Sequence, residues 1–248
     1  MIEGDKFSAC RLCGNVSSLC ESHIVPEFFY DYQYTGNSRK AIEIRVPVEE
    51  EKAIQERIFQ KGYREYLLCK SCEALICRYE APFALFWKEQ VLPKAPFALG
   101  QLLRFKVDYH LTKLLLLSIF WRSSISARFG QHMHLGPYSD KVRDILLKSR
   151  KPNQSQYPVL CVMNLQADGQ PFTNITPPEP AKVEAKNAYT MHFGGCKWHI
   201  VMSDNWIPRS LRPLEQVLSE DGTLHIYTQH FMQDKGISFI ASQLRSRQ

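Results

Sequence analysis

The chain has 248 residues, of which 44% are hydrophobic, and a formal net charge of +6 from 31 lysines and arginines and 25 aspartates and glutamates. This apolar content supplies a packed core and excludes a disordered chain, and the length suits one large domain or two small ones. The polar start MIEGDKFSAC lacks the apolar segment of a signal peptide, and the longest apolar stretch, LTKLLLLSIFW, is too short to span a bilayer. We therefore expect a cytoplasmic protein.

Candidate metal ligands open the chain, where Cys10, Cys13, Cys20 and His23 follow one another closely. The sequence has eight cysteines, and six of them lie between Cys10 and Cys77. Four of these six form two Cys-x2-Cys pairs. In an intracellular chain of this size, such pairs indicate metal binding rather than disulfide bonds.

Residues 33–58 are interpreted as an insertion. The insertion begins with the loop-like QYTGNSRK, and the acidic run in PVEEEKAIQERIF predicts a short surface helix. After it, YREYLL predicts a strand, and the second cysteine pair begins the helical stretch CEALICRYEAPFALFWKEQVL. The first predicted domain therefore covers residues 1–95.

The two cysteine pairs predict a structural Zn²⁺ site. Zinc takes four ligands at the corners of a tetrahedron, and each Cys-x2-Cys turn supplies two thiolates. The predicted ligands are Cys10, Cys13, Cys69 and Cys72. A second assignment is also open, in which Cys20 and His23 join the first pair in a local site. That assignment leaves the second pair and Cys77 in need of another partner.

The remaining residues, 96–248, are predicted to form a second domain with helices first and strands after them. Residues 101–129 have apolar side chains on all sides and predict a buried central helix, and residues 136–150 predict a one-sided helix. Strands are predicted for YPVLCVMNL, AYTMHF, CKWHIVM and TLHIYTQ, with a hairpin at Gly194–Gly195. The fold class is thus α+β, with a metal module, a helical middle and a mainly antiparallel sheet.

The positive charge of the protein is unevenly distributed. Residues 1–95 are nearly neutral, whereas residues 96–248 carry the excess of lysine and arginine. A basic surface attracts polyanions through counterion release. We therefore expect the second domain to bind nucleic acid or a protein partner, and we expect no membrane partner.

The order of the N-terminal motifs resembles a known family. A Cys-x2-Cys pair, the segment SHIVP, and a second Cys-x2-Cys pair that begins a helix are similar to the zinc-containing branch of the HNH endonuclease superfamily. The full pattern CRLCG…SHIVPEFFY…LLCKSCE, over about residues 8–85, also resembles bacterial HNH-like proteins. The resemblance implies a zinc-bound treble-clef module, that is, a ββα finger.

The resemblance also implies a catalytic site. It makes His23 the general base that activates water for attack on a phosphodiester, with Mg²⁺ or Mn²⁺ as the catalytic metal. Glu73 stands where the family has a terminal His or Asn, and so becomes a possible ligand of that metal. Ser22 stands where the family has an acidic residue, and the family's central asparagine has no clear match.

The leading hypothesis is therefore an HNH-type endonuclease that hydrolyses phosphodiester bonds, in DNA more than in RNA. By analogy with small HNH modules, it is the effector of a bacterial phage-defence or restriction system, beside a sensor or ATPase subunit. The alternative is a non-catalytic treble-clef zinc protein that binds nucleic acid or a protein partner. The departures from the family pattern and the near-neutral charge of residues 1–95 favour this alternative.

Overall fold

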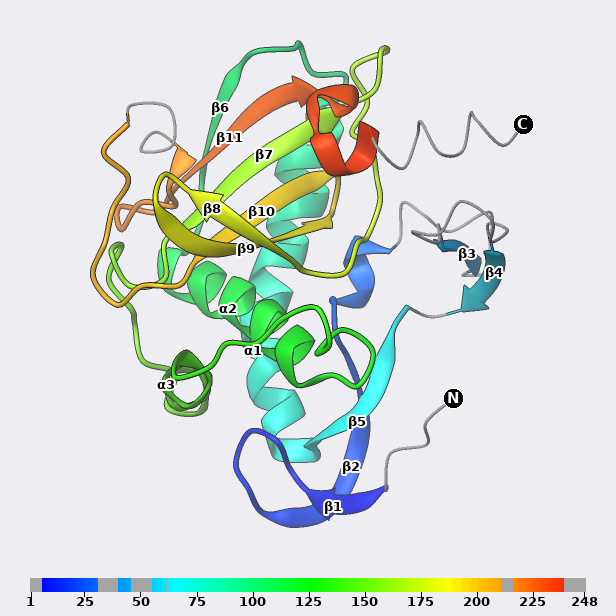
Figure 1. Ribbon diagram of the computed structural model, residues 1–248, viewed down its shortest axis with the longest axis vertical. Helices are drawn as coiled ribbons and strands as arrows, with labels where there is room; N and C mark the ends of the chain where they lie inside the picture. The colour runs from blue at the N-terminus through cyan, green and yellow to red at the C-terminus, as the bar shows by residue number, and fades with distance from the viewer. Residues whose placement is uncertain (1–5, 31–39, 46–54, 61, 211–215, 239–248) are drawn as a thin grey trace.

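The computed structural model describes residues 6–30, 40–45, 55–60, 62–210 and 216–238, and Figure 1 shows their arrangement. The described residues form a mixed α+β fold, which confirms the predicted class in its coarse form. A six-stranded sheet lies at one end of the molecule and a three-stranded sheet at the other, with the long helix α1 running between them (Figure 1).

The three-stranded sheet is antiparallel and has the order β1–β2–β5. Its strands are β1 (Phe7–Ala9), β2 (Val16–His23) and β5 (Arg64–Cys69). The last strand confirms the prediction made for YREYLL. It passes directly into α1 (Lys70–Phe86), which continues as a π-helical turn over Trp87–Val91 and a 3₁₀ turn over Leu92–Lys94. The second cysteine pair thus lies at the junction of strand and helix.

The predicted surface helix within residues 33–58 is wrong where the structure describes it. β3 (Lys40–Arg45) and β4 (Gln55–Gln60) pair as an antiparallel ribbon, and residues 46–54 lie outside the described residues. Polar and apolar residues alternate in the IEIR end of KAIEIR, the strand with which QERIFQ pairs. This period of two suits a strand, and pairing with β3 outweighs the acidic run that suggested a helix.

The six-stranded sheet has the order β6–β11–β7–β10–β9–β8, in which only the β7–β11 pair is parallel. Its strands are β6 (Leu102–Lys106), β7 (Val159–Leu165), β8 (Glu179–Val183), β9 (Lys186–Phe193), β10 (Cys196–Val201) and β11 (Thr223–His230). The four predicted strands are confirmed as β7, β9, β10 and β11. Gly194 and Gly195 form the β9–β10 turn with φ of 63° and 74°, as the hairpin prediction required.

Two further helices complete the described fold. α2 (Tyr109–Ile125) is buried on nearly every side, and α3 (Tyr138–Leu147) buries one face. Both helices were predicted, but the first begins later than expected, because Asp108 caps it by accepting a hydrogen bond from the Leu111 amide at 2.9 Å. No helix in the described part of the chain is both long and apolar enough to cross a membrane.

One apolar core joins the N-terminal elements to the six-stranded sheet. The ring of Phe29, just after β2, lies 4.9 Å from Phe193 of β9, and Trp87 lies 6.2 Å from Trp198 of β10. These side chains belong to a single cluster of buried residues. The domain boundary at residue 95 stays a prediction, but the two predicted domains pack as one body.

Candidate metal centre and its surroundings

The structure brings together the four cysteines of the two predicted pairs. Cys10 and Cys13 flank the turn between β1 and β2, Cys69 ends β5, and Cys72 lies in the first turn of α1. Their sulfur atoms all lie within 4.8 Å of one another, and these four residues are named here the cysteine cluster. In the described residues, no other group of three or more His, Cys, Asp or Glu side chains is so arranged.

The geometry of the cysteine cluster fits a zinc ion. Four thiolates at about 2.3 Å from a tetrahedral zinc are separated by roughly 3.8 Å. The sulfur atoms of Cys13 and Cys69 are 3.8 Å apart. The four cysteines can therefore hold a metal ion such as zinc, and the Cys13 and Cys69 sulfur atoms already have the separation that such an ion requires.

Backbone contacts hold the first cysteine pair in place. The amide of Arg11 donates to the carbonyl of Leu67 in β5 at 2.9 Å, and the amide of Gly14 donates to the carbonyl of Cys10 at 2.8 Å. Gly14 has a φ of 83°, a conformation that glycine adopts at no steric cost. The turn is thus fixed against β5 by the chain itself.

The environment of Cys69 favours a thiolate. Burial alone would raise the pKa of this thiol, but hydrogen bonds from the Ser71 hydroxyl and the Cys72 amide lower it to about 6. The Ser71 oxygen lies 3.1 Å from the Cys69 sulfur. At Cys72, in contrast, burial and the neighbouring sulfur atoms raise the pKa. The Cys69 sulfur thus favours the thiolate that binds a cation, whereas binding at Cys13 and Cys72, whose pKa values are raised, must displace protons.

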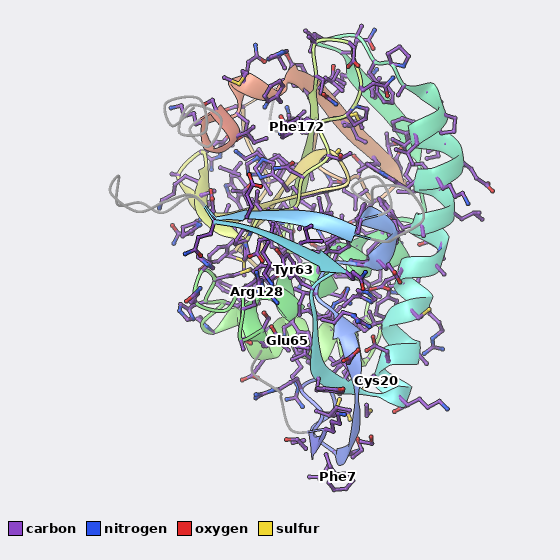
Figure 2. The ribbon with its side chains drawn as sticks, turned by 90° about the vertical axis from the view of Figure 1, so that its right-hand side faces the viewer. Phe7, Cys20, Tyr63, Glu65, Arg128 and Phe172 are labelled. Carbon is purple, nitrogen blue, oxygen red and sulfur yellow. The ribbon has the colours of Figure 1, made fainter. Side chains whose placement is uncertain are left out.

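Cys20 and Cys77 are not members of the cysteine cluster. Cys20 lies in β2 opposite Leu68, and burial, followed by the nearby Glu73 carboxylate, raises the pKa of its thiol. Figure 2 shows Cys20 on the strand beside α1. Cys77 is exposed on α1. The local site built from Cys20 and His23 is therefore not the arrangement that the structure brings together.

His23 ends β2 with its imidazole partly exposed. The side chain is 23% exposed, and its Nε2 lies 4.0 Å from Oε2 of Glu27. The carbonyl oxygen of His23 accepts a hydrogen bond from Nη1 of Arg122 at 2.5 Å. Arg122 belongs to α2 and is buried, so a residue of the C-terminal portion holds the end of this strand.

Glu73 belongs to the first turn of α1 and faces β2, where its carboxylate already has a hydrogen-bond partner. Its Oε2 accepts a hydrogen bond from the buried Ser22 hydroxyl at 2.8 Å. Burial raises the pKa of the Glu73 carboxyl, while the Ser22 hydrogen bond and the Arg122 charge counteract that effect. Because neighbouring side chains of a strand point to opposite faces, Ser22 faces Glu73, whereas His23 is directed elsewhere, toward Glu27.

The other acidic residues near His23 are engaged as well. Glu80 of α1 pairs with Arg122 at 2.7 Å, and Glu21 pairs with Arg64 at 3.0 Å. Sequence reasoning did not identify Arg122 as part of this region. The sequence signal for it was an arginine within a largely apolar helix, a position that favours a nearby carboxylate.

Comparisons of this chain with models of protein families, with curated proteins and with solved structures find no match.

Proposed function

We propose that the protein is a metal-dependent nuclease of the HNH type whose N-terminal portion is a zinc-bound treble clef. The order of elements supports the treble clef, since a cysteine turn, the β2–β5 pair and a helix that begins at the second cysteine pair occur in that sequence. The observation that carries the nuclease proposal is the His23 imidazole, partly exposed and 4.0 Å from the Glu27 carboxylate, on a strand attached to the cysteine cluster.

In this proposal, His23 accepts a proton from the attacking water, as an imidazole does near neutral pH. Glu27 orients the ring and stabilises the imidazolium that forms. Arg122 fixes the strand end through the His23 carbonyl oxygen. When bound, Mg²⁺ or Mn²⁺ stabilises charge on the phosphate and on the leaving oxygen.

The described residues allow a modest site for the catalytic metal. Mg²⁺ is commonly bound by one or two protein ligands, with water and phosphate oxygens completing the shell. The Glu27 carboxylate, whose Oε2 lies 4.0 Å from Nε2 of His23, would supply one such ligand, and His23 itself would stay unbound so that it can accept a proton. Glu73 joins such a site only if its carboxylate gives up the hydrogen bond from Ser22.

A cleavage assay tests the proposal. Supercoiled plasmid and a structured RNA are each incubated with the protein, with Mg²⁺, with Mn²⁺ or with no added divalent metal. We expect metal-dependent cleavage, of plasmid more than of RNA, and a loss of about 100-fold or more in rate for His23→Ala, which removes the general base. Glu73→Gln is the matched comparison, because it separates a metal ligand from a residue that only packs against Ser22. Equal cleavage by wild type and His23→Ala, or cleavage by neither, contradicts the assignment.

The second candidate function is a non-catalytic treble-clef zinc protein that binds nucleic acid or a protein partner. The observation in its favour is that Glu73 and Glu80 already have Ser22 and Arg122 as partners. Binding of the plasmid without cleavage under every metal condition supports this second candidate. The role as effector of a phage-defence or restriction system rests on the family resemblance and belongs to the first candidate.

A further inference from the structure

A cleft with basic walls lies beside α3, on a part of the chain to which the nuclease proposal assigns no role. It has a volume of about 390 Å³, within the range of roughly 300–1,000 Å³ that small-molecule sites occupy. We name it the basic cleft. The residues that matter for its chemistry are Lys141, Arg150, Lys151, Gln156, Tyr157 and Asp204.

The basic cleft carries more positive charge than its carboxylates balance. Asp204 accepts from the Lys141 amine at 2.5 Å and from the Tyr157 hydroxyl at 2.7 Å, so both of its oxygens are engaged. Asp144 is shared between Arg150 and Lys148. Among the residues that line the cleft, three are basic, namely Lys141, Arg150 and Lys151, and one is acidic, namely Asp204.

Lys151 and Lys141 are the two most informative cations. In the part of the chain that the structure describes, Lys151 forms no ion pair, and its amine lies 5.6 Å from the centre of the Tyr109 ring. Lys141 lies in the first turn of α3, where the helix dipole disfavours a cation. The helix dipole favours basic residues at the C-terminal end of α3, but it does not account for Lys141 near the N-terminal end. Lys141 is instead held at the wall of the cleft by its ion pair with Asp204.

The segment that carries Arg150 and Lys151 is fixed at both ends. Ser149 and Tyr157 have φ of 49° and 48°, values that non-glycine residues rarely adopt. Tyr79 of α1 holds Ser149 through a 2.6 Å hydroxyl contact, and the amide of Tyr157 donates to the carbonyl of Ser203 at 2.8 Å. The backbone that carries the two cations is therefore fixed before any ligand arrives, which lowers the entropy cost of binding.

We propose that the basic cleft binds a phosphate group of a nucleic-acid chain. Lysine and arginine side chains on a fixed wall are the groups that contact phosphate, and contacts to phosphate position a nucleic acid without reading its sequence. Tyr157 is buried, so the cleft offers no aromatic face on which a base could stack. The choice of nucleic acid as the source of the phosphate rests on the proposed function.

The position of α3 links the basic cleft to the cysteine cluster. Nε of Arg143, on the same helix, donates to the carbonyl of Leu12 in the first cysteine turn at 2.6 Å. A nucleic acid held at the cleft would therefore lie along a helix that is attached to the proposed nuclease module.

The test is a binding measurement with no added divalent metal, so that cleavage does not interfere. Fluorescence anisotropy of a labelled DNA oligonucleotide is measured over a range of salt concentrations for wild type, Lys151→Gln and the Lys141→Gln/Lys151→Gln double variant. We expect the double variant to bind at least tenfold more weakly near 0.1 M salt, and its salt dependence to fall by about two phosphate contacts. The control is Lys88→Gln, an exposed lysine at the end of the long helix, which should bind like wild type.

Further arms identify the source of the phosphate and separate this inference from the nuclease proposal. If inorganic phosphate or a mononucleotide binds as tightly as the oligonucleotide, the nucleic-acid assignment is overturned. If the double variant binds like wild type while retaining the same thermal unfolding, the cleft assignment is overturned. The two proposals fail separately. If His23→Ala cleaves like wild type while the double variant binds DNA weakly, the nuclease proposal alone has failed. If His23→Ala loses cleavage while the double variant binds DNA like wild type, the cleft proposal alone has failed.

Discussion

Lys113 is a lysine whose side chain lies in the apolar interior of the fold. Its side chain is fully buried in α2, and among the described residues its amine has no hydrogen-bond partner. Burial lowers the pKa of Lys113 to about 7, and the distant negative charge of Glu220 counteracts this only in part. An amine in such an environment is a cost to folding whenever it must be protonated.

We predict that Lys113→Met stabilises the protein, and that the gain depends on pH. Below about pH 7 the wild type carries the full cost of holding a charged amine in the interior. Between about pH 7 and 10.5 the unfolded chain keeps a proton that the folded chain releases, so the wild type becomes more stable as pH rises. Urea unfolding should therefore show a gain of a few kcal/mol at pH 6.5 that shrinks toward pH 10. If the gain in the free energy of unfolding is the same at both pH values, it comes from packing and not from the charge of Lys113.

The residues of the candidate site differ in how far sequence could predict them. The cysteine cluster was predictable because two Cys-x2-Cys pairs impose a local geometry that few other roles require. The partners of His23 were not, because the contact between Arg122 and the His23 carbonyl joins residues far apart in the chain. The engagement of Glu73 by Ser22 has the same origin, since it depends on how α1 lies against β2.

At the scale of elements, the junction of β5 and α1 decides how the cysteine cluster is built. Cys69 occupies the N-cap position of α1 at the end of β5, without a side-chain capping hydrogen bond, and its amide donates to the sulfur of Cys10 at 3.3 Å. The junction thus joins the strand pair, the first cysteine turn and the long helix at one point. A metal ion there would add a further link between these three elements.

We therefore predict that Cys69→Ser loses the bound metal, whereas Cys20→Ser keeps it. Cys69 supplies one of the four clustered sulfurs, and Cys20 lies beside the cluster without belonging to it. Elemental analysis of the purified variants should give about one zinc per chain for wild type and for Cys20→Ser, and far less for Cys69→Ser. The midpoint temperature of thermal unfolding should fall for Cys69→Ser and stay unchanged for Cys20→Ser. Loss of zinc from Cys20→Ser would instead support the local site with His23.

The prediction of helices and strands was wrong where an apolar run and a helix-capping residue indicated different boundaries. In residues 101–129 the apolar pattern is continuous, so β6 was merged into the helix that follows it. The cap at Asp108 marks the true start of α2, but an aspartate before an apolar run is a weaker signal than the run itself. In contrast, the strands β7, β9 and β10 were predictable because a glycine turn and short apolar runs point to the same structure.

At the scale of the whole molecule, the aromatic core makes the N-terminal portion depend on the sheet. Phe29 is fully buried between Phe83 of α1 and Phe193 of β9. A side chain on Gly194 would come within 2.5 Å of the Phe29 ring, so the β9–β10 turn accepts only glycine at this contact. The two predicted domains therefore pack their large aromatic side chains into one core, and a cavity on either side of it should lower the stability of both.

We predict that Phe29→Ala lowers the free energy of unfolding by about 3–5 kcal/mol, because it leaves a cavity in the shared core. The loss should appear equally in two measurements, namely zinc release to a coloured chelator, which reports on the cysteine cluster, and far-ultraviolet circular dichroism, which reports on all helices and strands. The control is Phe7→Ala, whose side chain is 66% exposed at the tip of β1, where Figure 2 shows it, and which should change stability by no more than about 0.5 kcal/mol. If zinc release and loss of secondary structure separate in Phe29→Ala, the boundary at residue 95 divides two units that unfold independently. Coincident transitions mean that the cysteine cluster, α1 and the sheet fold as one, because a single core holds them.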